Sequence, residues 1–356
     1  MSPAELVAVP DEPALGLAFR ATARLVAVYE RISAVSGRFR PEVVAVDRDL
    51  PAVVHSVRRE ADGVVGLELR PRDREHFPAW EPGCHLDLVL PSGAMRQYSL
   101  TGDPADLTSY RIAVRRIPGG GGGSIEAHGL AVGDAVVLRG PRNAFPFIEA
   151  PGYLFVAGGI GITPILPMIR EAVARGDDWA FVYTGRSVTT MPFLAEVERL
   201  ATEHPGRVYL RPDDLCGLPN AEDILAAAPP AATVYACGPP AMVDAIRAAV
   251  PSERVGSLHH ERFSALPVRG GEPFTVRLHR SGRTVEVAGD ETVLTALRRE
   301  IPAIAYSCQQ GFCGTCPVEV LAGTPIHRDR CLTDQQREHR LAVCVSRAED
   351  ELVLDL

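Results

Sequence analysis

The chain has 356 residues, of which 46% are hydrophobic and 23% charged, and its formal net charge is -8. This length predicts two or three domains, and the acidic balance argues against a concentrated basic surface for nucleic acid. No segment reaches the roughly 20 consecutive apolar residues of a membrane span, and the first residues lack the basic start and apolar run of a secretory signal. We therefore expect a cytoplasmic protein with no nucleic-acid or membrane partner.

Residues 1–50 contain a segment from Ala14 to Val35 whose apolar positions recur at roughly helical spacing before Pro41 interrupts the pattern. We predict a helical extension that packs on the main body. Residues 51–148 instead contain short alternating runs separated by Gly, Pro and Asp turns, among them VVGLELR, HLDLVL and YRIAVRR. Such a pattern predicts a small antiparallel β-barrel.

Two motifs in the predicted barrel point to a phosphate group. Arg96-Gln97-Tyr98-Ser99 closes one strand, and its alternation places the arginine and the tyrosine on one face, where they can hold a phosphate and a flavin ring. About twenty residues later Gly122-Gly123-Ser124 opens a predicted helix, whose amides and hydroxyl can bind the same phosphate. Each motif alone also fits a plainer interpretation, namely a solvent-facing arginine beside a core tyrosine, or a glycine linker.

Residues 151–263 alternate apolar runs such as YLFVAGG and TVYACG with helical stretches, which predicts a parallel, doubly wound α/β domain. The glycine-rich turn after the first run lets the backbone approach a pyrophosphate at a helix start. The turn after the last run ends at the same sheet edge, so the two predict one nicotinamide site. Its expected residues are Gly159, Gly161, Thr163, Pro164, Cys237, Gly238 and Pro239. Cys237 alone also fits a buried apolar residue.

The choice of nucleotide depends on the loops that follow two of the strands. Arg186 can pair with the 2'-phosphate of NADPH, although a single loop arginine is usually just solvated. Asp213 and Asp214 carry charges that repel this phosphate. We therefore expect NADH, with NADPH as the alternative.

Residues 264–272 have little periodicity and predict a linker, after which FTVRLHRSG and RTVEVAG predict a hairpin that opens a third domain over 273–356. Cys308, Cys313 and Cys316 follow the spacing C-x4-C-x2-C, and Cys344 comes later in the apolar run LAVCVSRA, for which we predict a strand beside the cluster. This is the plant-type spacing of a 2Fe-2S cluster, and we predict these four thiolates as its ligands. A four-cysteine zinc site is the alternative, although zinc usually takes paired C-x2-C hairpins. Cys331, in a polar stretch, is expected to be a bystander.

The order of these three regions resembles the phthalate dioxygenase reductase family of the ferredoxin-NADP reductase superfamily, which includes the vanillate demethylase reductases. The resemblance covers about residues 50–356. It implies an antiparallel β-barrel flavin domain that binds FMN, an α/β nicotinamide domain and an α+β, β-grasp ferredoxin domain. It also implies that Phe263 lies close to the flavin and that hydride transfer takes place among Ser99, Thr163 and Cys237. We expect such a chain to be a monomer.

Three modules in one chain suit the splitting of an electron pair. Nicotinamide gives up two electrons as hydride, a cluster accepts one, and a flavin can do both. A plant-type cluster has a potential near about -400 mV, low enough to reduce most haem or Rieske partners. The expected function is an NADH-dependent reductase for a separate Rieske-type dioxygenase or demethylase. A reductase for a haem-thiolate monooxygenase and a non-enzymatic carrier or redox-sensing module are the two alternatives.

Overall fold

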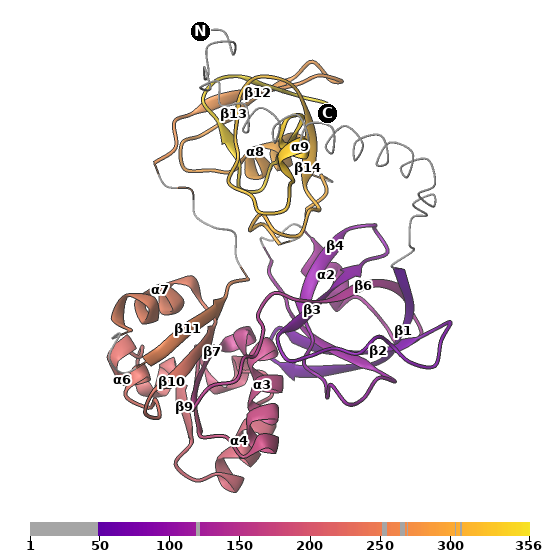
Figure 1. The fold of residues 1–356 in the computed structure, drawn as a ribbon. Coiled ribbons are helices and arrows are strands. Elements are labelled where there is room, and N and C mark those ends of the chain that lie inside the picture. The colour runs from indigo at the N-terminus through magenta and orange to yellow at the C-terminus, as the bar shows by residue number, and fades with distance from the viewer. Residues whose placement is uncertain are drawn as a thin grey trace, which may run out of the picture. The chain divides into compact units, whose positions relative to one another are not determined.

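The computed structural model describes residues 49–118, 122–250, 255–263, 268, 270–302, 304–306 and 308–356. The helix predicted between Ala14 and Val35 lies outside these residues. Three sheets of five or six strands follow one another along the described chain (Figure 1). None of the described helices is long and apolar enough to cross a membrane.

The first sheet is curled and antiparallel, with the strand order β4-β3-β6-β1-β2-β5. Alternate strand residues such as Leu67, Leu69, Leu86 and Leu88 enter one apolar core, and this period of two is what makes the short alternating runs strands. The antiparallel sheet predicted for the flavin domain is confirmed. Its elements are β1 (Asp49–Ala61), β2 (Val64–Pro71), β3 (Cys84–Val89), β4 (Met95–Ser99), β5 (Tyr110–Arg115), β6 (Ala135–Asn143) and the short helix α2 (Gly123–His128).

The second sheet is parallel throughout, with the order β11-β10-β7-β8-β9. Helices cover both faces, α3 and α4 on one and α6 and α7 on the other (Figure 1), so its central strands are apolar on both sides. The predicted doubly wound domain is confirmed. Its strands are β7 (Tyr153–Gly158), β8 (Trp179–Gly185), β9 (Val208–Pro212), β10 (Ala232–Cys237) and β11 (Val255–Glu261). Its helices are η3 (Gly159–Gly161), α3 (Ile162–Arg175), η4 (Val188–Thr190), α4 (Leu194–Glu203), α5 (Asp213–Cys216), α6 (Ala221–Leu225) and α7 (Pro240–Ala249).

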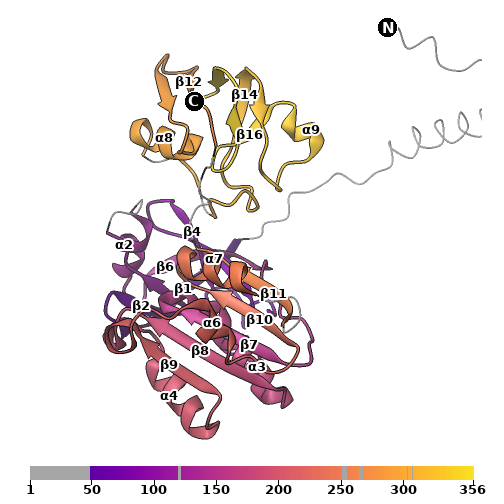
Figure 2. The same cartoon turned by 90° about the vertical axis from the view of Figure 1, so that its left-hand side faces the viewer.

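The third sheet has the order β13-β12-β18-β14-β16, and α8 packs against it (Figure 2). The hairpin predicted at its start forms, with Phe274 opposite Val287. Apolar Val293, Leu294 and Leu297 share the buried face of α8. The elements are β12 (Phe274–Leu278), β13 (Thr284–Val287), α8 (Val293–Glu300), β14 (Pro317–Ala322), β15 (Pro325–Ile326), α9 (Asp334–Arg337), β16 (Arg340–Ala342), β17 (Arg347–Ala348) and β18 (Leu352–Leu354).

The buried apolar clusters show which sheets pack against each other. Val64 and Ala113 of the first sheet belong to the same buried cluster as the inner residues of α3 and β7. Arg170 of α3 reinforces this joint, because its Nη1 donates to the carbonyls of Thr101 and Gly102 at 2.7 and 2.8 Å. The buried cluster of the third sheet, in contrast, is drawn from residues 274–354. The first two sheets therefore pack as one body, whereas the third has its own core.

Candidate functional site

The loop between α8 and β14 holds three of the predicted cluster ligands, and a turn brings the fourth beside them. The thiol of Cys308 shares hydrogen bonds with those of Cys313 and Cys344, which hold the pKa of Cys308 well below its ordinary value. Cys316 also bonds to Cys344. Because β16 ends at Ala342, Cys344 lies in a turn and not in the strand that its apolar run predicts. All four thiols nevertheless meet at one place.

Two glycines let the loop fold tightly around these thiols. Gly311 and Gly314 have φ angles of 79° and 70°, which favour glycine. A Cβ at Gly311 would lie 2.7 Å from a methyl group of Val345 and 3.1 Å from the Cα of Asp329. The backbone amide of Gln310 donates to the sulfur of Cys308 at 3.4 Å. The loop therefore leaves room for backbone amides to approach the thiols.

The spacing of the four cysteines favours a pair of iron ions over zinc. Structural zinc sites usually take paired C-x2-C hairpins, whereas the four thiolates of a 2Fe-2S cluster follow the plant-type spacing found in this chain.

Cys331 lies close to the ligands but faces another group. Its sulfur is 3.9 Å from a carboxylate oxygen of Asp329, and burial together with this anion raises the pKa of the Cys331 thiol. Asp329 is buried and also accepts hydrogen bonds from the amide of Leu332 and the hydroxyl of Ser346.

The predicted phosphate residues surround the start of α2. Arg96 donates from Nη1 to the carbonyl of Met95 at 2.8 Å, and from Nη2 to the hydroxyl of Tyr306 at 2.9 Å. A Cβ at Gly123 would lie 2.5 Å from Nε of Arg96, so glycine is required for the arginine to lie against this turn. Gly122 has a φ angle of 77°. A cradle of this kind, open and cationic, fits a phosphate group.

A cavity of about 1150 Å³ connects this cradle with the cluster loop. Arg96, Gly122 and Gly123 line it on one side, and Tyr306 and the segment Cys313–Thr315 line it on the other. The predicted phosphate site and the predicted cluster therefore open on the same space, although they lie more than 180 residues apart in sequence.

The remaining flavin residues predicted in the barrel are partly or fully buried. Burial raises the pKa of Tyr98 to about 12, so its phenol is neutral at physiological pH. Ser99 is buried at the end of β4, opposite His85 of β3. Ser124 accepts a hydrogen bond from the amide of Ile117 at 3.0 Å, and its hydroxyl proton can still be donated.

His85 is a residue that the sequence analysis missed. Its side chain is 5% exposed, and within the described structure Nε2 has no hydrogen-bond partner. Its ring meets that of Phe312, in the cluster loop, edge-on at 6.3 Å. Burial lowers the pKa of His85 to about 4, so the ring is neutral. An isolated histidine in an alternating strand gives no sequence signal for such a contact.

The two glycine turns predicted for the nucleotide touch each other where the strand order reverses, between β7 and β10. A Cβ at Gly161 would overlap the carbonyl of Cys237, and one at Gly158 would overlap the ring of Pro239. A Cβ at Gly238 would lie 2.9 Å from the backbone of Gly158. Glycine is therefore needed at these positions for the two turns to form one crevice.

Thr163 and Cys237 are both buried in this region. The hydroxyl of Thr163, in the first turn of α3, donates to the carbonyl of Ile160 at 3.0 Å. Burial raises the pKa of Cys237 well above its ordinary value, so the thiol stays protonated. Pro164 continues the first turn of α3.

Glu261 is a second residue that the sequence analysis missed. It ends β11 directly opposite Cys237 in β10 and is half-buried, and its Oε2 is buried with no partner among the described residues. Burial raises the pKa of Glu261 to about 8. An acid at the carboxyl end of a parallel strand, in HHERF, is the signal that could have revealed it.

We expect this carboxyl to make stability fall as the pH rises. The raised pKa means that the folded chain binds a proton more tightly than the unfolded chain, so the contribution of Glu261 declines between its unfolded pKa and about pH 8. In urea unfolding, the free energy of unfolding of the parent chain should be about 3 kcal/mol lower at pH 8 than at pH 5. Glu261→Gln should remove this difference. An unchanged pH dependence in this variant would contradict the assignment.

The residues that bear on the choice of nucleotide lie on adjoining loops. Arg186 is exposed after β8, and its carbonyl accepts a hydrogen bond from the amide of Asp214 at 3.2 Å. Burial and the charge of Asp214 raise the pKa of Asp213. The arginine predicted to attract a 2'-phosphate and the two aspartates predicted to repel it therefore lie on neighbouring loops.

The end of the second domain also reaches the cluster loop. The side-chain amide of Gln310 donates to the carbonyl of Arg262, whose guanidinium pairs with Asp244 of α7 at 3.1 Å. Phe263 follows directly and is 47% exposed. Because the ring of Phe263 is exposed beside this contact, packing in a protein core does not explain an aromatic residue at this position.

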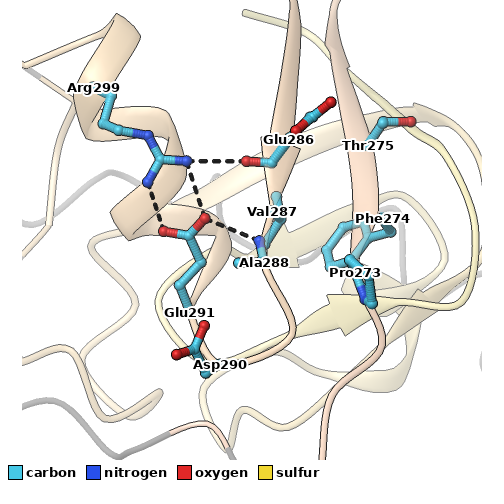
Figure 3. Close-up of a pocket in the computed structure, with 9 residues that line it drawn as sticks. All are labelled: Pro273, Phe274, Thr275, Glu286, Val287, Ala288, Asp290, Glu291 and Arg299. Atoms are coloured by element: carbon cyan, nitrogen blue, oxygen red, sulfur yellow. Dashed lines mark hydrogen bonds and ion pairs between the residues drawn. The ribbon is translucent and has the colours of Figure 1, made fainter.

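A hollow of about 700 Å³ lies between β12, β13 and α8. Polar groups that line it bind one another (Figure 3). Arg299 donates to both oxygens of Glu291, at 2.7 and 3.0 Å, and to the carbonyl of Glu286. These bonds tie α8 to the hairpin. None of the predicted cofactor residues lines the hollow, and we assign it a structural role.

Two protein-family models match parts of the chain. Residues 155–248 match the oxidoreductase NAD-binding domain family, and residues 276–349 match the 2Fe-2S iron-sulfur cluster binding domain family. The second range includes the four cysteines whose thiols meet in the structure.

Individual relatives cover most of the chain. A phenoxybenzoate dioxygenase subunit beta from Ectopseudomonas oleovorans is 40% identical over 85% of this chain and 96% of its own length. The solved structure of phthalate dioxygenase reductase, described as modular for electron transfer from pyridine nucleotides to 2Fe-2S, matches with a TM-score of 0.63 at 35% identity. The match covers 87% of this chain and 98% of that one. An intact type IV self-sufficient cytochrome P450 monooxygenase matches at 37% identity and a TM-score of 0.61 over 89% of this chain, which spans only 43% of that chain.

Proposed function

The chain belongs to the phthalate dioxygenase reductase family, and from this premise we propose that it passes electrons from NADH through FMN and a 2Fe-2S cluster to a separate terminal oxygenase. It is an NAD(P)H-dependent oxidoreductase, so the alternative of a non-enzymatic carrier is wrong. The cavity that joins the Arg96 cradle to Cys313–Thr315 is the observation that carries this proposal. Residues of the predicted flavin cradle and of the cluster loop line this one cavity, which would bring a flavin and a cluster close together.

The cationic cradle would hold the FMN phosphate. Bound FMN would accept the two electrons of a hydride and pass them on one at a time. Arg96 binds the phosphate through its guanidinium, and Gly123 leaves the space for it. Tyr98 offers a neutral ring, and Ser99 offers a hydroxyl at the end of β4. The full set of flavin residues is Arg96, Tyr98, Ser99, Gly122, Gly123, Ser124 and Phe263.

The crevice between the two glycine turns would hold the nicotinamide nucleotide. The start of α3 favours its pyrophosphate, and the neutral side chains of Thr163 and Cys237 exclude water from the reacting end. Burial raises the pKa of the Glu261 carboxyl, which lies opposite Cys237, to about 8, and this favours its neutral form at neutral pH. Asp213 and Asp214 disfavour a 2'-phosphate and support NADH over NADPH, despite Arg186.

Flavin identity tests the proposal. The cavity offers one phosphate cradle, so we expect the purified chain to release FMN on denaturation and to show flavin and iron-sulfur absorbance together. Chromatography of the released flavin measures this directly, with free FMN and FAD as standards. Recovery of FAD as the sole flavin contradicts the assignment.

A haem-thiolate monooxygenase is the second candidate for the electron acceptor. The similarity over 89% of this chain to part of a self-sufficient cytochrome P450 monooxygenase supports it. Other relatives of the chain are named as parts of dioxygenase systems. A reductase of this architecture therefore suits either type of acceptor. NADH oxidation coupled to a Rieske oxygenase or to a cytochrome P450, measured side by side, distinguishes them.

The chain acts as a monomer in the cytoplasm within this proposal. None of the eight cysteines forms a disulfide in the part of the chain that the structure describes, which suits a reducing compartment. Light scattering of the purified protein measures the oligomeric state.

A further inference from the structure

A tyrosine of the third domain touches the arginine of the phosphate cradle. Tyr306 lies two residues before the cluster ligand Cys308 and is 5% exposed. Its hydroxyl accepts the 2.9 Å hydrogen bond from Nη2 of Arg96, and the guanidinium carbon stands 4.2 Å from the centre of its ring. Tyr306 also lines the cavity that the cradle opens on.

The position of this tyrosine is fixed from the side of the third domain. Its ring belongs to the buried cluster that includes Leu297 and Cys316. The guanidinium of Arg298 lies at 4.8 Å from the same ring, so the ring is held between two cations. Tyr306 is therefore a rigid acceptor presented to Arg96 by a different domain.

We propose that Tyr306 is a positioning residue of the flavin-phosphate site, which is complete only when the third domain contributes this side chain. The bonds to Tyr306 and to the Met95 carbonyl fix the guanidinium plane at two points. An arginine held in place before binding loses less conformational freedom when it takes a phosphate, so affinity rises. This inference rests on the proposed binding of FMN.

A second consequence is thermodynamic. If the contact between Tyr306 and Arg96 strengthens FMN binding, then bound FMN must strengthen the association of the third domain with the barrel by the same factor. Flavin loading and the placement of the cluster loop are thus coupled through one hydrogen bond.

The test uses the full chain stripped of flavin and compares two ligands, FMN and riboflavin, which differ only by the phosphate. Titration with FMN, followed by flavin fluorescence, should give a dissociation constant about tenfold higher for Tyr306→Phe than for the parent chain. Riboflavin should bind both proteins equally. Tyr209→Phe, on the exposed edge strand β9, is the matched control and should bind FMN as the parent does.

Three outcomes decide the matter. Weaker FMN binding with unchanged riboflavin binding supports the inference, and in an Arg96→Gln background Tyr306→Phe should then have no further effect. Unchanged FMN binding, or an equal loss for both ligands, overturns it, since the tyrosine would then act on the fold or not at all. Failure of the parent chain itself to bind FMN overturns the proposed function as well, and is recognised before any variant is compared.

Discussion

Removal of residues 273–356 is expected to leave the reduction of ferricyanide by NADH nearly unchanged and to reduce electron delivery to a protein acceptor to the background of free flavin. Hydride transfer requires the barrel and the two glycine turns, which share one buried core and the Arg170 clamp. The deleted segment has its own core and contains all four predicted cluster ligands. A small oxidant can reach a flavin directly, whereas a large acceptor needs the cluster.

The measurement compares ferricyanide reduction with reduction of the terminal oxygenase, or of cytochrome c as a stand-in, on one preparation. FMN must be present in excess, because the truncation also removes Tyr306 from the phosphate cradle. A full-length chain that lacks the cluster is the matched control and should behave like the truncated one. Coupled turnover of the truncated chain at the full-length rate would mean that electrons leave by another route.

The fold was predictable because its signals are local. Alternation in segments such as VVGLELR, apolar runs such as YLFVA before a glycine turn, and the spacing from Cys308 to Cys316 each lie within a dozen residues. Each also specifies one element or one loop almost independently of its surroundings. The error at Cys344 has the same origin, since an apolar run predicts burial but does not decide between a strand and a buried turn.

The contacts that join the domains were not predictable in this way. Tyr306 and Arg96 are separated by 210 positions, and nothing in either neighbourhood indicates the other. The raised pKa of Glu261 likewise arises from enclosure by distant elements, and not from adjacent residues in the sequence. Motifs therefore predicted the cofactor sites, whereas only the three-dimensional packing showed the contact between Arg96 and Tyr306.

Cys344→Ser is expected to prevent normal cluster assembly, whereas Cys331→Ser should leave the cluster spectrum intact. The thiol of Cys344 bonds to those of Cys308 and Cys316, which places it among the other predicted ligands. A serine oxygen is a harder ligand than a thiolate and suits iron in such a cluster poorly, so iron content should fall at least about tenfold. Cys331 instead faces Asp329 and contributes no such thiol bond among those described.

Iron and sulfide analysis, with the visible and electron paramagnetic resonance spectra of the reduced protein, measures the cluster in both variants. The two substitutions are the same chemical change at neighbouring thiols, so each serves as the control for the other. Flavin content should be equal in both, because neither cysteine lines the cavity at the Arg96 cradle. A normal cluster in Cys344→Ser together with a lost one in Cys331→Ser would make Cys331 the fourth ligand, and the segment around Asp329 would then have to turn its cysteine toward Cys316 when iron binds.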